Sequence, residues 1–339
     1  MNAPSKQVLT NSNSHKKNLG KHTLTERLLS IHSTTTSYAG AFYHYTSPEG
    51  LLGILKNRNI FFTDAQFLND SRERLQINDE LHYFWSINKK QYDKDFYNML
   101  WNIKVDFYED DDFSYIENHD EMKICRYFVL SASFEPDSLS MWKYYAKNET
   151  YNGYCLGLFT PALSDEWIDR DTGVAIEESA VLYSSEEKQE CIFRAVGKLY
   201  DCWHKYKRSK KLDQKIMSDF KSWVSCVSIF FKDTCFSDER EYRFVAIVPK
   251  DKLSTLSYDY SGEKTKMYDF KSKNGVVIPY IKMPFNYWNA DNCWAIESIR
   301  IGPSIYSDQM QHGINQLIQS LDYKLENCSI EKSKIPLRY

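Results

Sequence analysis

Three pairs of side chains in this 339-residue sequence have residue types found in active sites, and each pair lies on a separate segment with β-strand character. The pairs are His44 with Tyr45, Ser131 with Ser133, and Glu239 with Glu241. Residues two apart on a strand share a face, so the two serines project to one side of their strand and the two glutamates to one side of theirs. Histidine and carboxylate side chains are common general acids and bases. A lone histidine on a strand is more often structural, but three such signals on three strands favour one shared cleft.

The two glutamates have a cationic neighbour. If residues 236–248 form one strand, alternation places Glu239, Glu241 and Arg243 on the same face. Two carboxylates and a guanidinium are costly to bury there unless they pair or take part in a reaction. The strand alone leaves both interpretations open, a structural Glu–Arg lattice and a catalytic carboxylate.

Several common catalytic and nucleotide-binding motifs are missing. The sequence has no GxxxxGK[ST] or GxGxxG loop for phosphates, no HExxH zinc motif and no GxSxG nucleophile elbow. It contains only 12 glycines, so a glycine-rich nucleotide loop is not expected anywhere. A bound nucleotide would have to be held by side chains and strand edges.

The composition predicts a cytoplasmic protein without membrane contact. There is no charged-then-apolar leader and no apolar run of about 18 residues. The net charge of −3 provides no overall attraction to nucleic acid. Eight scattered cysteines without a CxxC pair indicate reduced thiols rather than a disulfide frame or a zinc site.

Two charged runs each have a plain and a functional interpretation. The acidic run 109–112 fits no calcium-loop spacing, so we interpret it as a solvated loop and predict no metal site. The basic run 205–211 could contact phosphates, but cations also suit the solvated end of a helix.

Hydrophobic periodicity predicts one α+β domain at 39–339. A polar, disordered segment at 1–38 precedes it, and a helical insertion at about 186–224 interrupts it. Residues 39–73 have a strand–helix–strand pattern followed by a polar loop, and 125–160 repeat the pattern.

The first helix has a start signal in the sequence. Thr46 and Glu49 have the spacing of a capping box, which predicts that the helix begins between them.

Six spaced motifs resemble, in order, an uncharacterised bacterial family catalogued as domain of unknown function 2971. They are Tyr43–Ser47, Leu68–Asp70 with Glu73, Ser138 to Gly153, Phe231 to Arg243, Ile301–Pro303 and Ser333 to Arg338. The resemblance covers roughly residues 41–339, and the family name implies no activity.

The motif order also resembles, more distantly, the ADP-ribosyltransferase superfamily. That resemblance implies split mixed or antiparallel sheets around a cleft that binds NAD as substrate without a glycine-rich loop. It implies that His44 hydrogen-bonds the nicotinamide ribose and that Glu241 is the final catalytic glutamate, with Glu239 two residues before it. Ser131 or Ser133 would fill the second signature position, and Tyr144 or Tyr145 would supply a stacking ring.

The predicted site follows from this second resemblance. The catalytic residues are Glu241, His44 and Glu239, and the NAD-contacting residues are His44, Tyr45, Thr46, Asn69, Asp70, Ser131, Ser133, Trp142, Tyr145, Arg243 and Arg338. A carboxylate near the ribose would stabilise the positive charge that develops as the bond to nicotinamide breaks. The expected function is NAD-dependent modification of a macromolecule, nucleic acid or protein, as a toxin or antiphage defence effector.

Two other functions remain open from the sequence. One is a non-catalytic module that binds a nucleotide as a sensor. The other is a nuclease that uses Asp70, Glu73, Glu239 and Glu241 around a divalent metal, since clustered carboxylates suit a two-metal site.

Overall fold

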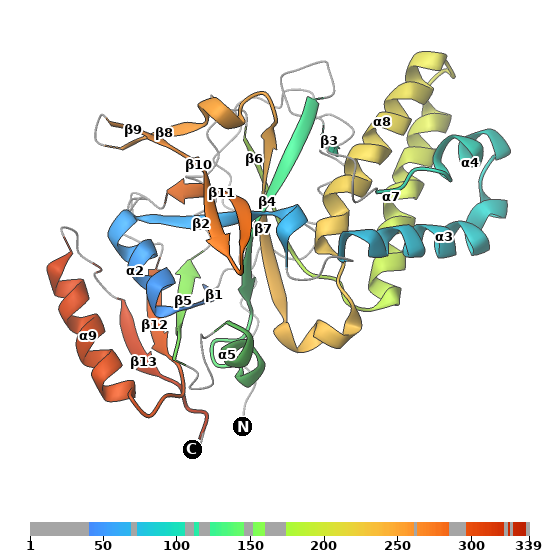
Figure 1. Ribbon diagram of the computed structural model, residues 1–339. Coiled ribbons are helices and arrows are strands. Elements are labelled where there is room, and N and C mark those ends of the chain that lie inside the picture. The colour runs from blue at the N-terminus through green and yellow to red at the C-terminus, as the bar shows by residue number, and fades with distance from the viewer. Residues whose placement is uncertain are drawn as a thin grey trace, which may run out of the picture.

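The protein is described by a computed structural model (Figure 1). The structure describes residues 41–68, 73–105, 112–114, 123–145, 152–159, 174–260, 263–284, 296–321, 325 and 328–336. The predictions for segment 1–38, for Asn69 and Asp70, for Arg338 and for most of the acidic run 109–112 lie outside these residues.

Eleven of the described strands join one sheet in which nearly all neighbours are antiparallel. They are β1 (Ala41–Thr46), β2 (Asn59–Asp64), β3 (Asp112–Ser114), β4 (Lys123–Ser133), β5 (Tyr154–Phe159), β6 (Ala175–Ala180), β7 (Glu241–Pro249), β10 (Tyr268–Lys273), β11 (Val276–Pro284), β12 (Ile296–Ile301) and β13 (Ser329–Lys332). The central pair is β4 and β7, which run antiparallel from Cys125 opposite Pro249 to Ser133 opposite Glu241. A separate hairpin joins β8 (Ser257–Tyr260) to β9 (Glu263–Lys266).

The sheet forks along the edge of β4 that lies opposite β7. Near the middle of that edge, Val129 pairs with Thr63 of β2, and at its end Ser133 pairs with Tyr43 of β1. Between these points, Leu130–Ala132 have no ladder partner on that edge among the described strands. One arm of the fork continues through β2, β11 and β10, and the other through β1, β5, β12 and β13. Backbone groups in the gap need other partners, which makes the fork a natural place for a site.

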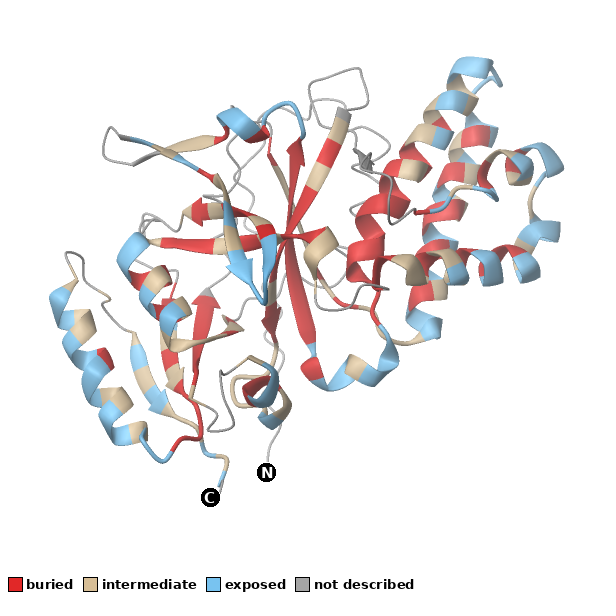
Figure 2. Cartoon of the chain, in the orientation of Figure 1, coloured by how far each residue is buried: buried red, intermediate tan, exposed pale blue. Residues whose placement is uncertain are grey.

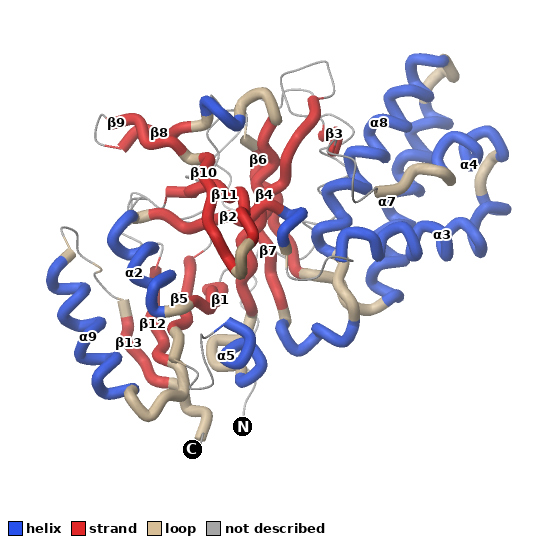
Figure 3. The backbone as a smooth tube through the Cα atoms, in the orientation of Figure 1, coloured by secondary structure: helices blue, strands red, loops and turns tan. Residues whose placement is uncertain are grey.

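The α-helices of the described residues are unevenly placed around the sheet (Figure 3). They are α2 (Pro48–Asn57), α3 (Gln76–Asn88), α4 (Lys94–Leu100), α5 (Leu139–Tyr145), α7 (Ser185–Lys205), α8 (Lys210–Val227) and α9 (Ser307–Ser320). α3, α4, α7 and α8 form one helical group beside the sheet, and α5 lies near the open end of the fork.

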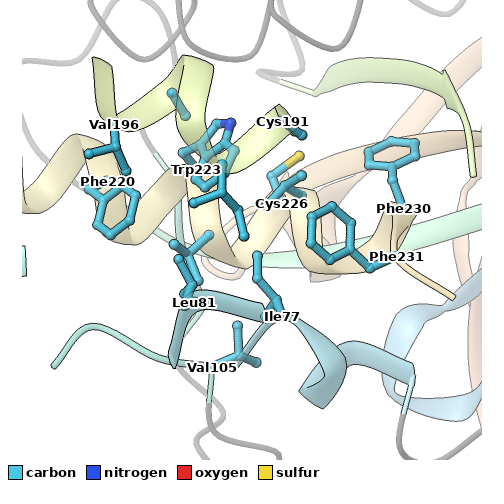
Figure 4. Close-up of a cluster of buried hydrophobic side chains, with 14 of the residues drawn as sticks. Ile77, Leu81, Val105, Cys191, Val196, Phe220, Trp223, Cys226, Phe230 and Phe231 are labelled. Carbon is cyan, nitrogen blue, oxygen red and sulfur yellow. The ribbon is translucent and has the colours of Figure 1, made fainter. Parts of the chain in front are cut away.

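Alternation on the central strands divides the buried side chains into two cores (Figure 2). Val245 and Ile247 of β7 face the helical group, whereas Phe244 and Val248 face the core under the two arms. In the helical core, Ile77 and Leu81 of α3 point toward side chains of α8 such as Trp223 (Figure 4). The predicted alternation of residues 241–248 is therefore confirmed.

The predicted helical insertion at 186–224 consists of two helices, α7 and α8, rather than one. Ser184 and Glu187 form a capping box at the start of α7. The chain leaves the helix at Tyr206, and Ser209 caps α8 by accepting a hydrogen bond from the backbone N–H of Leu212 at 3.2 Å. The basic run 205–211 thus forms the turn between two helices.

The predicted start of the first helix between Thr46 and Glu49 is confirmed, but its N-cap is Ser47 rather than Thr46. Thr46 is the last residue of β1, and Ser47 is the N-cap of α2, accepting from the backbone N–H of Gly50 at 3.2 Å. Pro48 follows at the first helical position, where a missing N–H costs nothing.

The α+β prediction is confirmed. In place of the predicted split sheets, the described strands of both arms belong to one sheet that forks at β4. Each of the seven cysteines in the described residues is a free thiol. No helix within the described residues is both long and apolar enough to cross a bilayer.

Candidate functional site

A cavity of about 160 Å³ lies at the fork of the sheet. Its wall includes His44 of β1, Ser131 of β4, Glu241 and Arg243 of β7, and Tyr145 of α5. Residues far apart in the sequence meet here because β1 and β2 diverge along the same edge of β4.

His44 bridges the unpaired stretch of that edge. Its Nδ1 lies 2.9 Å from the backbone carbonyl oxygen of Ser131, in the middle of the gap. Burial lowers the pKa of His44 below its ordinary value, with a further contribution from Lys271, so the ring is neutral near pH 7. A neutral ring that donates from Nδ1 keeps Nε2 as a hydrogen-bond acceptor.

Glu241 is the most heavily engaged side chain at the fork. Arg243 donates to both carboxylate oxygens, from Nε and Nη2, at 2.8 Å each. Lys232 Nζ donates to Oε2 at 3.0 Å, and the Ser131 side chain also hydrogen-bonds the carboxylate. Burial alone would raise the pKa of Glu241, but the charges of Arg243 and Lys232 outweigh it and hold the pKa at about 2. Glu241 therefore remains ionised at any physiological pH.

Two further carboxylates complete the buried network. Lys232 Nζ donates to Oε2 of Glu239 at 2.8 Å, and Arg243 forms an ion pair with Glu73. All five side chains are almost fully buried. Burial raises the pKa of Glu73, and the charge of Glu241 adds to the effect while Arg243 opposes it. The two carboxylates that share Arg243 thus have pKa values shifted in opposite directions, as is common for acid–base pairs in active sites.

The depressed pKa of Glu241 predicts a loss of stability in acid. Its folded-state pKa is about 2 and its ordinary value 4.5, so the stabilisation is present above pH 4.5 and lost as the pH falls toward 2. We expect the free energy of unfolding to fall by about 3 kcal/mol more in the wild type than in Glu241→Gln over this range. Urea titrations at a series of pH values measure the difference, and parallel curves for the two proteins would contradict it. Glu73 acts in the opposite direction in the wild type because its folded pKa is raised, and part of that effect depends on the charge of Glu241.

Tyr145 and two lysines complete the surroundings of these charges. Burial, followed by the charge of Glu241, raises the pKa of Tyr145 well above its ordinary value, so the phenol stays protonated. Lys271 and Lys273 come from the β10–β11 hairpin, and Lys271 Nζ donates to the Thr63 hydroxyl at 3.0 Å. The cavity therefore combines an anion, a neutral histidine and cations from one arm.

Six of the residues predicted from the sequence line this cavity. They are His44, Tyr45, Ser131, Tyr145, Glu241 and Arg243. The Tyr45 hydroxyl already has two hydrogen-bond partners within the protein. It donates to the Glu135 carbonyl at 2.8 Å and accepts from the Ser138 backbone N–H at 2.9 Å. Arg243 already pairs with two carboxylates, so it is placed to hold Glu241 rather than the pyrophosphate of NAD.

Four predicted residues lie outside the cavity wall formed by the described residues. Trp142 is buried, and its indole N–H donates to Asp137 at 2.8 Å. Ser133 is fully buried and donates to the Glu239 carbonyl at 2.7 Å, which selects Ser131 as the serine at the site. Neither side chain therefore lines the cavity. For Ser133 the reason is the register of β4, since alternation alone does not show which of the two serines lies at the gap in the fork.

Thr46 and Glu239 are the other two predicted residues that lie outside the cavity wall. The Thr46 side chain lies against Gly50 of α2. Glu239 belongs to a 3-10 helical turn before β7, and Arg240, with φ of 43°, separates it from the strand. It contacts Lys232 instead of the cavity.

Sequence reasoning did not assign Lys232, Lys271 or Lys273 to the site, and it considered Glu73 only as a metal ligand. The signal that favours Lys232 and Glu73 is physical, since two buried glutamates require cations and a cation requires anions. Their partners follow only from the tertiary fold. Within the described residues, no group of three or more His, Cys, Asp or Glu side chains is arranged to hold a metal ion.

Comparison with known proteins adds one finding. Residues 141–244, which are 104 of the 339, match the model of a family described as protein of unknown function (DUF2971). The match runs from α5 through α7 and α8 to the start of β7, and so contains Tyr145, Lys232, Glu241 and Arg243 but not His44 or Ser131. No curated protein and no solved structure matches the chain.

Proposed function

We propose that this protein is an ADP-ribosyltransferase-like enzyme that cleaves NAD at the fork of the sheet and transfers ADP-ribose to a macromolecule. The observation that carries the proposal is the convergence of His44, Ser131 and Glu241, which come from three different strands, on one cavity. The forked sheet is compatible with the split sheets of that superfamily, whose resemblance to this chain rests on motif order.

The cavity fits one end of NAD. Sites for drug-sized ligands enclose about 300–1,000 Å³. A space of about 160 Å³ therefore admits the nicotinamide end, while the remainder of NAD must extend over the mouth of the cavity. Lys271 and Lys273 supply positive charge for its phosphates, and Nε2 of the neutral His44 is available to accept from a ribose hydroxyl.

The charges of the site suit the bond that has to break. The bond between the ribose C1′ and the nicotinamide nitrogen breaks with its electron pair on nicotinamide, and positive charge develops on the ribose. Ionised Glu241 stabilises that charge. The acceptor then bonds to C1′ and releases a proton, for which Glu73 is suited because its pKa is raised and its side chain lines the cavity.

The experiment is nicotinamide release from NAD by the purified protein and by His44→Ala. We expect release by the wild type and about tenfold lower kcat/KM in the variant, corresponding to one lost hydrogen bond. His82→Ala, a change at an exposed histidine of α3, serves as the matched control and should leave the rate unchanged. Equal rates for His44→Ala and the wild type would remove His44 from the site.

A specific observation favours a second candidate, a nucleotide sensor without turnover. Both oxygens of Glu241 already accept hydrogen bonds from Arg243, and Lys232 adds a third, so much of its charge is neutralised before any substrate enters. This candidate predicts saturable NAD binding without nicotinamide release.

A further inference from the structure

A second and larger cavity, of about 480 Å³, lies beside the first on the β2–β11–β10 arm. Its wall includes Lys56 and Arg58 at the end of α2, Asn59 and Phe61 of β2, and Tyr258 of β8. Phe61 also lines the cavity at the fork, so the two spaces adjoin.

The register of the arm places both cavities on one face of the sheet. Thr63 lies opposite Tyr280, and Phe61 lies opposite Lys282. Paired residues of antiparallel strands point to the same side, and alternation adds Lys271 and Lys273 of β10 to it. We call this face the arm strip and define it by Phe61, Thr63, Lys271, Lys273, Tyr280 and Lys282. The opposite face of the arm packs into the core through Phe62 and Ile281, among others. The end of the β10–β11 hairpin is exposed (Figure 2).

Positive charge gathers along the arm strip. Lys282 pairs with Asp269 at 2.6 Å, but no carboxylate among the described residues pairs with Lys56, Lys271 or Lys273. Burial, and then the charge of Lys273, lower the pKa of Lys271. Lys271 and Lys273 therefore lie on this face without an ion pair among the described residues, beside the Lys282–Asp269 pair, and Lys56 adds a further cation at the second cavity, although the whole chain carries a net charge of −3. Such a local cationic strip suits a polyanion.

The wall of the second cavity also includes a residue with an unsatisfied acceptor. Asn59 is only 5% exposed, and its Nδ2 donates to the Asn57 carbonyl at 3.0 Å, but its buried Oδ1 has no hydrogen-bond partner. A buried carbonyl without a donor is costly, so a ligand whose N–H group displaces the neighbouring side chains and reaches this oxygen would be stabilised. Every nucleobase carries an N–H donor on its Watson–Crick edge, and the half-buried rings of Phe61 and Tyr258 offer apolar contact for a base.

We propose that the arm strip binds single-stranded nucleic acid, with one base seated in the second cavity and the backbone following the lysines toward the fork. A single strand fits because a base must leave its stack to enter a cavity, whereas a duplex keeps its bases inside. The four-residue step from Asn59 to Thr63 spans roughly 13 Å, enough for about two nucleotides. Binding of the single strand does not require cleavage of NAD, although Lys271 and Lys273 belong to both proposed sites. A further role of the arm strip, in which the bound nucleic acid is the acceptor of ADP-ribose, rests on the proposed function.

The test is fluorescence anisotropy with a labelled single strand of about ten nucleotides, within the site sizes of known single-strand binders. For the wild type we expect saturable binding, weaker binding to the matching duplex, and a slope of log Kd against log salt of about +2 for three phosphates. Lys56→Glu should weaken binding by about tenfold, and its matched control Lys207→Glu, in the basic run between α7 and α8, by less than about twofold. Thr265→Phe adds no charge but fills the second cavity, and should also weaken binding.

The outcomes separate this proposal from the proposed function. Absence of saturable binding, tighter duplex binding, or equal losses in Lys56→Glu and Lys207→Glu would overturn it. If Thr265→Phe abolished NAD binding and left oligonucleotide binding intact, the second cavity would belong to NAD and the proposal would also fail. Oligonucleotide binding by a protein that releases no nicotinamide would support the arm strip and contradict only the transferase.

Discussion

Replacing Glu241 by glutamine is expected to reduce nicotinamide release by roughly 100- to 1,000-fold, the usual effect of removing one group that stabilises transition-state charge. Glutamine keeps the shape, and its one oxygen can still accept from Lys232 Nζ and Arg243 Nη2, but it loses the bond from Arg243 Nε and the negative charge that we propose faces the ribose. The measurement is single-turnover release with the protein in excess over NAD, where slow product dissociation does not hide the chemical step.

The matched control is Glu239→Gln. Glu239 pairs with the same lysine and is buried to a similar degree, but it does not line the cavity. It should lose stability with little change in the rate per folded molecule. Circular dichroism gives the folded fraction of each variant. Full activity in folded Glu241→Gln, or equal losses in both variants, would show that Glu241 has a structural role only.

Removing the Arg243 guanidinium is expected to destabilise the fold by about 3–5 kcal/mol, because it leaves carboxylates buried without their cation. Arg243 is 2% exposed and contacts both Glu73 and Glu241, and its Nη1 also donates to the Ile229 carbonyl. Arg243→Met retains the apolar bulk of the side chain and removes its charge. Urea unfolding at neutral pH measures the loss.

Arg194→Met provides the reference for an exposed arginine. Arg194 pairs with Glu190 one helical turn away on the surface of α7, where such pairs contribute about 0–1 kcal/mol. If the free energies of unfolding of Arg243→Met and Arg194→Met differed by less than about 1 kcal/mol, the buried network would contribute no more stability than a surface pair. Because buried carboxylates can take up protons, the Arg243→Met protein should lose less stability when the pH is lowered.

Local pattern was sufficient to predict the strands of the site. Alternation over 241–248 and the strand-like run Phe42–Tyr45 that contains His44 depend on neighbouring residues only, and the structure confirms both. The choice of Ser131 over Ser133 required the pairing register of β4, since only the register shows that the gap between the arms falls at Leu130–Ala132.

The rest of the site depends on contacts that no local pattern encodes. Lys232 reaches Glu241 because the chain turns through a 3-10 segment before β7. Glu73, which follows β2 in the sequence, reaches Arg243 of β7 through the tertiary fold. The distant superfamily resemblance implies that Trp142 contacts NAD, yet its side chain turns toward Asp137 and Tyr45. Tyr145, three residues further along the same seven-residue helix, does line the cavity. A short motif therefore does not show which of its side chains reaches the cavity.

Isothermal titration of NAD into the purified protein, with nicotinamide measured in the same samples, tests the central claim most directly. The account predicts saturable binding at one site per chain, accompanied by nicotinamide release that Glu241→Gln abolishes. Binding without release would support the sensor. Absence of NAD binding by a folded protein would contradict the assignment of the fork as an NAD site.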